Sequence, residues 1–445
     1  SLYPHLIMQY NISPETLVNG GDEIVGGMVD KILNGKAKNN TEYCMTPNGA
    51  FFRKDIKGFL PELMENMYND RVKYKKLMLE AKQEYENTKN PKILKDISRY
   101  DNIQMAKKIS LNSAYGAIGN NWFRYFDLLV ATAITTSGQL SIRWIEKSLN
   151  IHLNKILETD NVDYVIASDT DSVYITFDKL VIKLFPEGTP TEKIINFLDK
   201  IATEKLEPFI DKSYQSLAKE MNAYEQKMEM GREAIADKGI WTAKKRYILN
   251  VWDMEGVRFK EPYLKIMGIE AVKSSTPAPC REKIKQALKI IMSGSEEELN
   301  NFIQEFRSQF MKLDAKLIAY PRSCNGVKKF TGENKLFASG APIHVKGAIL
   351  YNHCIRENKL ENKYPLIQEG DKVRFLHLRQ PNIYQSTAFS FMTDIPSELD
   401  IVDKIDYETQ FEKSFVEPLT AITKSMNWLV DSKYGVEGSL EGFFA

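Results

Sequence analysis

Two long stretches of helical periodicity, separated by one break, constrain the fold of this chain more than any other feature. Between residues 59 and 87, apolar side chains recur at 60, 63, 64, 67, 74, 77, 78 and 81, as on one face of a helix. Asn90-Pro91 interrupts the pattern, and a second helix is predicted over about 92–117. Two long helices joined by so short a turn form an antiparallel hairpin, so we predict a rigid helical lever.

Length and composition indicate a multidomain globular protein. A chain of 445 residues exceeds one hydrophobic core, so we expect several domains built from discontinuous segments. No uninterrupted apolar run approaches the roughly 20 residues that span a bilayer, so no membrane association is expected. The net charge of +1 neither supports nor excludes nucleic-acid binding, because such binding needs a basic channel rather than a basic average.

The cysteines and histidines do not predict a zinc site or a disulfide framework. None of them has the spacing of a metal site, so we expect any metal to be held by oxygen, in a reducing compartment. These residues are Cys44, Cys280, Cys324, Cys354, His5, His152, His344, His353 and His377.

Two β-rich runs surround a short acidic segment. Residues 164–167 and 172–177 flank Ser-Asp-Thr-Asp, a pattern typical of a β-hairpin with the acidic turn at its tip. Asp169 and Asp171 are two residues apart, so both carboxylates can converge on a hard cation. The alternative interpretation is a polar turn, because aspartate is common in turns.

The second predicted helix carries a stripe that suits a nucleotide. Lys108, Asn112 and Tyr115 are spaced i, i+4, i+7 and share one face. The lysine could grip a triphosphate while the other two border an incoming base, although a solvated helix edge has the same pattern. On the first helix, Arg71 and Lys75 are also i, i+4, which predicts either a phosphate clamp or solvated surface.

Three further segments carry local signals. Residues 1–4 indicate the end of a strand that runs into a helix, with the first turn of the helix set by Pro4. Backbone N–H groups at such a helix start favour anions, so Tyr3 would lie beside a bound nucleotide. Residues 244–247 form a basic and aromatic cluster before a strand-like run, typical of phosphate contact or of a solvated face. After residue 269 the chain is predicted to be helical, with Gly294 ending one helix and residues 295–298 forming a capping box.

In order and spacing these motifs resemble the family B DNA polymerases, most closely the replicative enzymes of T-even-type bacteriophages. Ser1-Leu2-Tyr3-Pro4 is similar to the end of the family's first polymerase motif, and residues 108–116 match K-x-x-x-N-S-x-Y-G. Residues 168–172 match the D-T-D-S motif, although Ala167-Ser168 stand where the family has Tyr-Gly, and residues 244–247 are the K-K-R-Y motif.

The resemblance implies an α/β (α+β) fold arranged as a right hand. The palm, with its sheet, would comprise residues 1–57 and 121–268, interrupted by helical-hairpin fingers at 58–120. Residues 269–445 would form a mostly helical thumb with a C-terminal clamp-binding tail.

The resemblance also implies template-directed transfer of nucleotides from dNTPs to a primer 3′-hydroxyl. Two Mg²⁺ ions, or Mn²⁺ in their place, would be held by Asp171, Asp169 and Glu233, with Lys108 as a further catalytic residue. Tyr3 would exclude a ribose 2′-hydroxyl. The full nucleotide-binding set is Ser1, Leu2, Tyr3, Arg71, Lys75, Lys108, Asn112 and Tyr115, and the DNA-binding set is Lys244, Lys245, Arg246, Tyr247, Lys265 and Lys273.

The implied partners are primer-template DNA, dNTPs, a sliding clamp and a separate N-terminal polymerase and exonuclease chain, in the cytoplasm of an infected bacterial host. The clamp would bind Leu440, Phe443 and Phe444 near the end of the chain. The alternative is that these side chains fold back on the thumb.

One departure from the family matters for activity. The family's first motif is D-x-x-S-L-Y-P-S, whose aspartate would lie three positions before Ser1 and is not in this chain. We therefore expect little or no primer extension by the isolated chain. Two other functions stay open: a non-catalytic DNA-binding accessory protein derived from a polymerase, and an unrelated nucleotide-sugar transferase that uses Asp-x-Asp. The second leaves residues 108–116 and 244–247 unexplained.

Overall fold

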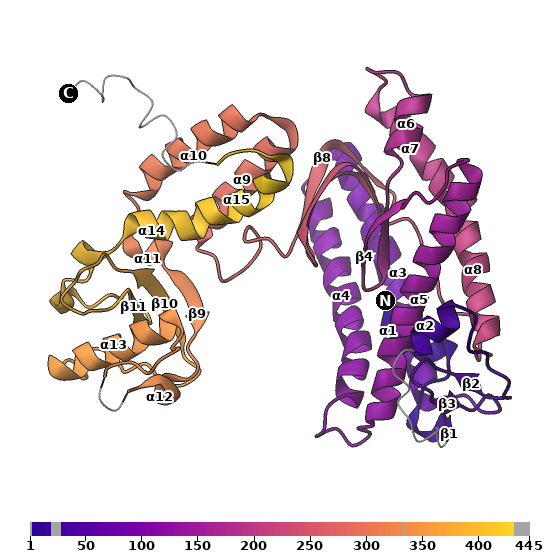
Figure 1. Ribbon diagram of the computed structural model, residues 1–445, viewed down its shortest axis with the longest axis horizontal. Coiled ribbons are helices and arrows are strands. Elements are labelled where there is room, and N and C mark those ends of the chain that lie inside the picture. The colour runs from indigo at the N-terminus through magenta and orange to yellow at the C-terminus, as the bar shows by residue number, and fades with distance from the viewer. Residues whose placement is uncertain (1, 19–27, 333–334, 431–445) are drawn as a thin grey trace. The chain divides into compact units, whose positions relative to one another are not determined.

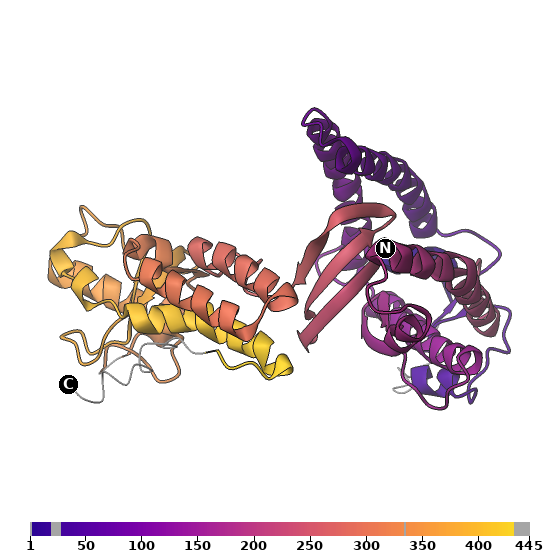
Figure 2. The ribbon, with the colours of Figure 1, turned by 90° about the horizontal axis from the view of Figure 1, so that it is seen from above.

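The computed structural model describes residues 2–18, 28–332 and 335–430, and the chain divides into two compact units (Figure 1). Unit 1 comprises residues 1–236 and 251–263, and unit 2 comprises residues 237–250 and 264–445. The chain passes between the units within three consecutive strands that form one sheet, in the order β6 (Ala234–Ala243), β7 (Arg246–Met254) and β8 (Val257–Met267) (Figure 2).

The predicted helical hairpin is confirmed. Helices α3 (Phe59–Thr88) and α4 (Ile93–Ile118) pack against each other along their length (Figure 1). Helix α3 ends at Lys89, which adopts a left-handed conformation with φ 52° and donates its N–H to the Tyr85 carbonyl. Asn90-Pro91 then begins the short turn, because proline cannot continue a helix.

Helix α1 (Leu2–Gln9) is the packing centre of unit 1. Every residue from Pro4 to Gln9 is buried, and the helix packs against α3, α4 and α5 (Leu128–Ile156). A Cβ atom at Gly138 of α5 would lie 3.1 Å from the Leu2 Cδ2 atom, so the glycine permits this close approach. The sequence predicted the end of a strand in residues 1–4. For the described residues this prediction is wrong, because helix α1 already begins at Leu2.

The predicted acidic β-hairpin is also confirmed. Strands β4 (Val165–Asp169) and β5 (Ser172–Ile175) pair antiparallel, with Asp169 opposite Ser172. The remaining elements of unit 1 are η1 (Pro14–Thr16), α2 (Met28–Leu33), α6 (Asp178–Leu184), α7 (Thr191–Ile201), the π-helix η2 (Ala202–Leu206), α8 (Glu207–Glu220) and the antiparallel sheet β1-β3-β2, with β1 (Leu17–Val18), β2 (Cys44–Met45) and β3 (Phe51–Phe52).

Unit 2 combines helices with a sheet that the sequence did not predict. The expected capping box is present, because the Ser295 side chain accepts from the Glu298 N–H and the Glu298 side chain accepts from the Ser295 N–H. Its helices are α9 (Ala278–Ser293), α10 (Glu296–Phe310), α11 (Ala315–Ile318), α12 (Val327–Phe330), α13 (Ile343–Glu357), α14 (Tyr407–Phe411) and α15 (Glu417–Thr423), with short η3 (Ser397–Leu399), η4 (Val402–Lys404), η5 (Glu412–Val416) and η6 (Lys424–Met426). Strands β9 (Tyr320–Ser323), β10 (Lys372–His377) and β11 (Ala388–Phe391) form an antiparallel sheet in the order β11-β10-β9.

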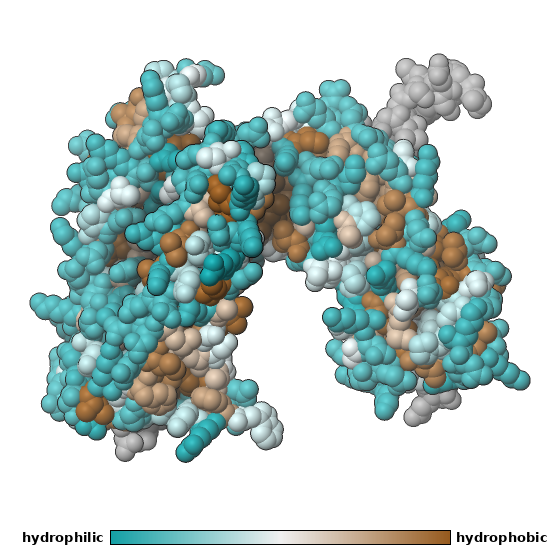
Figure 3. Space-filling model, turned by 180° about the vertical axis from the view of Figure 1, so that it is seen from behind, coloured by the Kyte–Doolittle hydropathy of each residue, from teal (hydrophilic) through white to brown (hydrophobic). Residues whose placement is uncertain are grey.

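The surface and the mixture of elements agree with a globular α/β protein. The face in Figure 3 is mainly hydrophilic, with hydrophobic residues gathered in separate patches. Within residues 2–18, 28–332 and 335–430, no helix has an apolar stretch long enough to cross a bilayer. All four cysteines are buried and free.

A cluster of phenylalanines forms the centre of the unit 2 core. Phe306 is 2% exposed, and its ring centroid lies 4.7 Å from Phe415, 5.8 Å from Phe411 and 5.8 Å from Phe310. The cluster joins α10 to α14 and η5, which are about 100 positions apart in the sequence.

Removing the Phe306 ring should therefore destabilise unit 2 strongly. We expect Phe306→Ala to lower the free energy of unfolding by about 3–5 kcal/mol, because the rigid aromatic neighbours leave a cavity. Urea denaturation of the variant measures this loss. Ile383→Ala is the matched control, since Ile383 is 76% exposed and its loss should change little. A loss for Phe306→Ala as small as that of the control would contradict the packing described.

Candidate nucleotide and metal site

The three predicted residues of the stripe on α4 differ in exposure. Lys108 and Tyr115 are half-buried, whereas Asn112 is exposed. The neighbouring Lys107 makes the contact across the hairpin, with its Nζ atom 2.6 Å from the Asp70 carboxylate on α3. Among the described residues, no ion pair involves Lys108, whereas its neighbour Lys107 is paired with Asp70.

Helix α1 brings Tyr3 against the end of this stripe. The ring centroids of Tyr3 and Tyr115 lie 4.4 Å apart with an interplanar angle of 33°. Burial, and then the neighbouring Tyr3 phenol, raise the pKa of Tyr115, so this phenol stays neutral at physiological pH. Leu2 lies against Gly138 of α5. Residues 2, 3 and 115, which the sequence assigned to one nucleotide pocket, therefore surround one junction of three helices.

Arg71 and Lys75 lie one turn apart on α3 but have different surroundings. Arg71 is only 8% exposed, and its Nε atom is buried with no hydrogen-bond partner in the described structure. The Lys75 Nζ atom lies 2.5 Å from the carboxylate of Glu255, in the turn between β7 and β8. One cation therefore has unused hydrogen-bonding capacity, and the other already has an anionic partner.

The hairpin tip holds Asp169 and Asp171 around a left-handed residue. Thr170 has φ 56°, and its hydroxyl donates to Asp169 Oδ1 at 2.9 Å, while the Asp171 N–H donates to the Asp169 carbonyl at 2.6 Å. Asp169 is half-buried and Asp171 is exposed. Burial, with the Asp171 charge as the next cause, raises the pKa of Tyr214 on α8, so the phenol near this carboxylate stays protonated.

The third predicted metal ligand comes from a different segment of unit 1. Glu233 is exposed, directly before β6, and its carbonyl accepts from the Glu255 N–H at 2.6 Å. Among the residues that the structure describes, no group of three or more His, Cys, Asp or Glu is arranged to hold a metal ion. The donors at the hairpin tip are two carboxylates. Their oxygen chemistry fits a hard cation such as Mg²⁺, which commonly takes one or two protein carboxylates and completes its shell with water and phosphate.

Two of the predicted DNA-binding residues of unit 2, Arg246 and Lys273, contact Glu270. A Cβ atom at Gly268, which has φ 64°, would lie 2.1 Å from the Lys245 carbonyl oxygen, so only glycine allows the β6–β7 turn to approach the segment after β8. Arg246 Nη1 and Nη2 then lie 3.0 and 2.8 Å from the two carboxylate oxygens of Glu270, and Lys273 Nζ lies 3.0 Å from one of them.

The other members of that set differ in exposure. Lys244 and Lys245 are exposed in the β6–β7 turn, and Lys265 is half-buried on β8. Tyr247 is 5% exposed, and its ring stacks on Trp241 with centroids 6.1 Å apart. The two lysines of the turn therefore present the accessible charge of this cluster.

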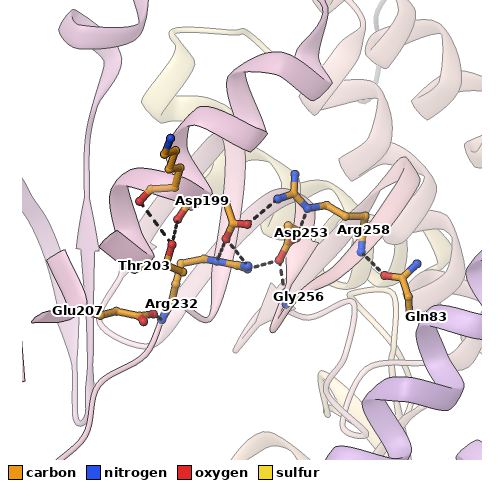
Figure 4. Close-up of polar contacts among 9 residues, drawn as sticks. Gln83, Asp199, Thr203, Glu207, Arg232, Asp253, Gly256 and Arg258 are labelled. Atoms are coloured by element: carbon orange, nitrogen blue, oxygen red, sulfur yellow. Dashed lines mark hydrogen bonds and ion pairs between the residues drawn. The ribbon is translucent and has the colours of Figure 1, made fainter. Parts of the chain in front are cut away.

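An ion network around one buried carboxylate in unit 1 was not predicted from the sequence. Asp253 on β7 is fully buried and forms ion pairs with Arg232 and Arg258, both of which also contact Asp199 on α7 (Figure 4). The Arg258 N–H donates to Gln83 Oε1 on α3 at 3.0 Å. A signal did exist, because strand alternation places Asp253 on the same face as the buried residues 249 and 251.

Some predicted residues lie outside the described structure. They are Ser1 of the nucleotide set and Leu440, Phe443 and Phe444 of the clamp-binding tail.

The chain is similar in sequence to known DNA polymerases. Residues 1–196 match the sequence profile of DNA polymerase family B. The chain is 33% identical to the DNA-directed DNA polymerase of Enterobacteria phage T4, over 98% of the chain and 54% of that protein. It is 35% identical to the DNA-directed DNA polymerase of Escherichia phage RB69, over 96% of the chain and 52% of that protein. A DNA polymerase beta of African swine fever virus is 28% identical over 61% of the chain and 23% of its own length. The chain thus spans about half the length of the phage relatives.

The Glu270 cluster predicts a pH-dependent contribution to stability. Burial alone would raise the pKa of Glu270, but hydrogen bonds from Arg246 and Lys273 outweigh it and hold the pKa below its ordinary value. A lowered pKa means that the stabilisation is present above the ordinary glutamate pKa of about 4.3 and is lost as the pH falls through the folded-state pKa.

Glu270→Gln should accordingly lower the free energy of unfolding by about 1–3 kcal/mol at neutral pH. The deficit should begin to shrink in urea titrations below about pH 4, and it should disappear once the pH falls below the lowered pKa at which the folded wild-type carboxylate is protonated. Glu282→Gln is the control, since Glu282 is 70% exposed in its pair with Lys285. A deficit that does not change with pH would contradict the role of the charge.

Proposed function

This chain belongs to DNA polymerase family B, and on that basis we propose that it carries the nucleotide- and primer-binding half of a template-directed DNA polymerase. The activity would be 5′–3′ nucleotidyl transfer from a dNTP to a primer 3′-hydroxyl, in the cytoplasm of an infected bacterial host. The observation that carries the proposal is the junction of α1, α4 and α5. There the ring centroids of Tyr3 on α1 and Tyr115 on α4 lie 4.4 Å apart, and α4 also bears Lys108.

The chain's own residues supply binding and orientation in this proposal. The Lys108 ammonium would contact the triphosphate, while Arg71 offers a nearly buried guanidinium whose Nε atom lacks a partner. The rings of Tyr3 and Tyr115 offer flat surfaces to the nascent base pair and to the sugar, and Tyr3 would exclude a 2′-hydroxyl. Asn112, exposed on the same helix face, would border the base.

Divalent cations would be held by Asp169 and Asp171, with Glu233 as a further proposed ligand. When bound, a pair of Mg²⁺ or Mn²⁺ ions would activate the primer hydroxyl and neutralise charge on the triphosphate, in a two-metal mechanism. The hairpin geometry supports the two aspartates, because a tight turn brings both carboxylates to one end of the β4–β5 ribbon.

The architecture supports the assignment of residues 58–120 as fingers, within a palm of residues 1–57 and 121–268 followed by a thumb of residues 269–445. The α3–α4 hairpin provides a projecting lever. Primer-template DNA would contact the basic cluster that includes Lys244, Lys245 and Arg246, and a sliding clamp and a separate N-terminal polymerase and exonuclease chain are the further proposed partners.

Lys108→Ala tests the proposed nucleotide site. A phosphate contact to a charged group contributes about 1.5–3 kcal/mol, so the variant should bind a dNTP about tenfold or more weakly. The assay is equilibrium binding of the dNTP to the chain with Mg²⁺ and a primer-template whose primer ends in a dideoxynucleotide, which allows binding but no extension.

Lys95→Ala is the matched control, because Lys95 is an exposed lysine nearer the other end of the same helix. Equal dNTP affinities for the Lys108 and Lys95 variants would contradict the proposed function.

A further inference from the structure

The contact between Lys75 and Glu255 joins the middle of α3 to the β7–β8 turn within unit 1. The Nζ atom and the carboxylate are 2.5 Å apart, and the two side chains are 32% and 31% exposed. The residues are 180 positions apart in the sequence, so the pair exists only because the fold brings α3 to this turn. Its partial exposure leaves both groups within reach of a competing ligand.

The backbone of the turn is unfavourable for glutamate. Glu255 has φ 51° and Gly256 has φ 87°, the two positive values of a tight hairpin turn in which Asn, Asp or Gly is preferred at the first position. A bulky side chain in this conformation is destabilising. A glutamate at this place therefore carries a conformational cost that its carboxylate must offset.

The ion network of Figure 4 holds the turn in place. The Asp253 carboxylate accepts from the Gly256 N–H at 3.0 Å and forms ion pairs with Arg232 and Arg258. The Glu255 N–H is satisfied by the Glu233 carbonyl at 2.6 Å. These contacts fix the backbone of Glu255 and so direct its side chain to α3.

A second contact keeps α3 beside the turn without using charge. Gln83 Oε1 accepts from the Arg258 N–H at 3.0 Å, eight residues and about 12 Å along the helix from Lys75. Loss of the Lys75–Glu255 pair therefore leaves α3 attached at Gln83. Lys75 can exchange its anionic partner without release of the helix from this contact.

We propose that Glu255 is a positioning residue that binds the Lys75 ammonium in place of a triphosphate and must be displaced when a nucleotide binds. This inference rests on the proposed function, which makes Lys75 a triphosphate contact. The Glu255 carboxylate holds Lys75 in position and lowers the apparent affinity for a nucleotide. Only a ligand with more negative charge than one carboxylate competes well for the Lys75 ammonium. Glu255 thereby sets the threshold for nucleotide binding.

Glu255→Gln tests the competition directly, because it removes the charge and keeps nearly the same shape. Partly exposed ion pairs contribute up to about 1 kcal/mol, so the variant should bind dATP about two- to fivefold more tightly. The probe is dATP with Mg²⁺ and a dideoxy-terminated primer-template that presents thymine. The gain should shrink as ionic strength rises from roughly 0.05 to 0.5 M, since salt screens the pair.

Two further variants separate this effect from a structural one. Glu80→Gln removes one negative charge from α3, where Glu80 lies 4.0 Å from Lys76, and should leave dATP affinity unchanged. Lys75→Ala should weaken binding, and adding Glu255→Gln to it should give no gain, because the carboxylate then has no ammonium to occupy.

Each outcome decides one of the two proposals. A tighter Glu255→Gln variant whose gain requires Lys75 supports the inference. Unchanged or weaker binding by Glu255→Gln, with weaker binding by Lys75→Ala, overturns the inference and leaves the proposed function standing. Failure of the unsubstituted chain to bind dATP overturns the proposed function itself. Thermal melting of each variant verifies that it is folded.

Discussion

The burial of helix α1 is the constraint on which the candidate site depends. Six consecutive residues, Pro4 to Gln9, are removed from solvent between α3, α4 and α5, so both arms of the helical hairpin share their support with α5. A helix buried on all sides has little freedom to rotate, because protein interiors are packed to crystal-like density. The start of α1 therefore holds Tyr3 against Tyr115, and Gly138 allows Leu2 to approach α5 closely.

Ion pairs between basic side chains and carboxylates are the second feature that orders the candidate site. Cations that the sequence assigned to phosphate have carboxylate partners here: Lys75 with Glu255, and Arg246 and Lys273 with Glu270. Lys108 is an exception in the described structure. In the proposed function, these carboxylates would keep the basic side chains ordered before phosphate binds, and a polyanionic ligand would replace them because its charge is higher. The fully buried Asp253 differs, since removing it would leave Arg232 and Arg258 with the partly exposed Asp199 as their shared carboxylate partner.

The local elements could be predicted from the sequence because their signals are local. Helical periodicity and the Asn90-Pro91 break predicted α3 and α4 within one residue at most ends. The β4–β5 hairpin followed from β-rich runs around a polar turn, and the capping box of α10 followed from its serine and glutamate. Each of these patterns is contained within about 30 residues.

Features that depend on distant partners could not be predicted in the same way. Lys107 and Lys108 are adjacent on one helix, and only the packing of the hairpin decides that Lys107 meets Asp70. The sheet β11-β10-β9 joins short strands from a region expected to be mostly helical, because each strand is stabilised by neighbours far along the chain. The helical start at Leu2 likewise reflects burial against three helices, which overrides a local preference for extended structure.

The most direct test of the central claim is template-dependent nucleotide selection by the chain. Each of the four dNTPs would be titrated, with Mg²⁺, against complexes of the chain with dideoxy-terminated primer-templates that differ only in the templating base. We expect that in each complex the complementary dNTP binds most tightly, and that the preference changes when the templating base changes. Equal binding of all four dNTPs, or a preference independent of the template, would contradict the proposed function.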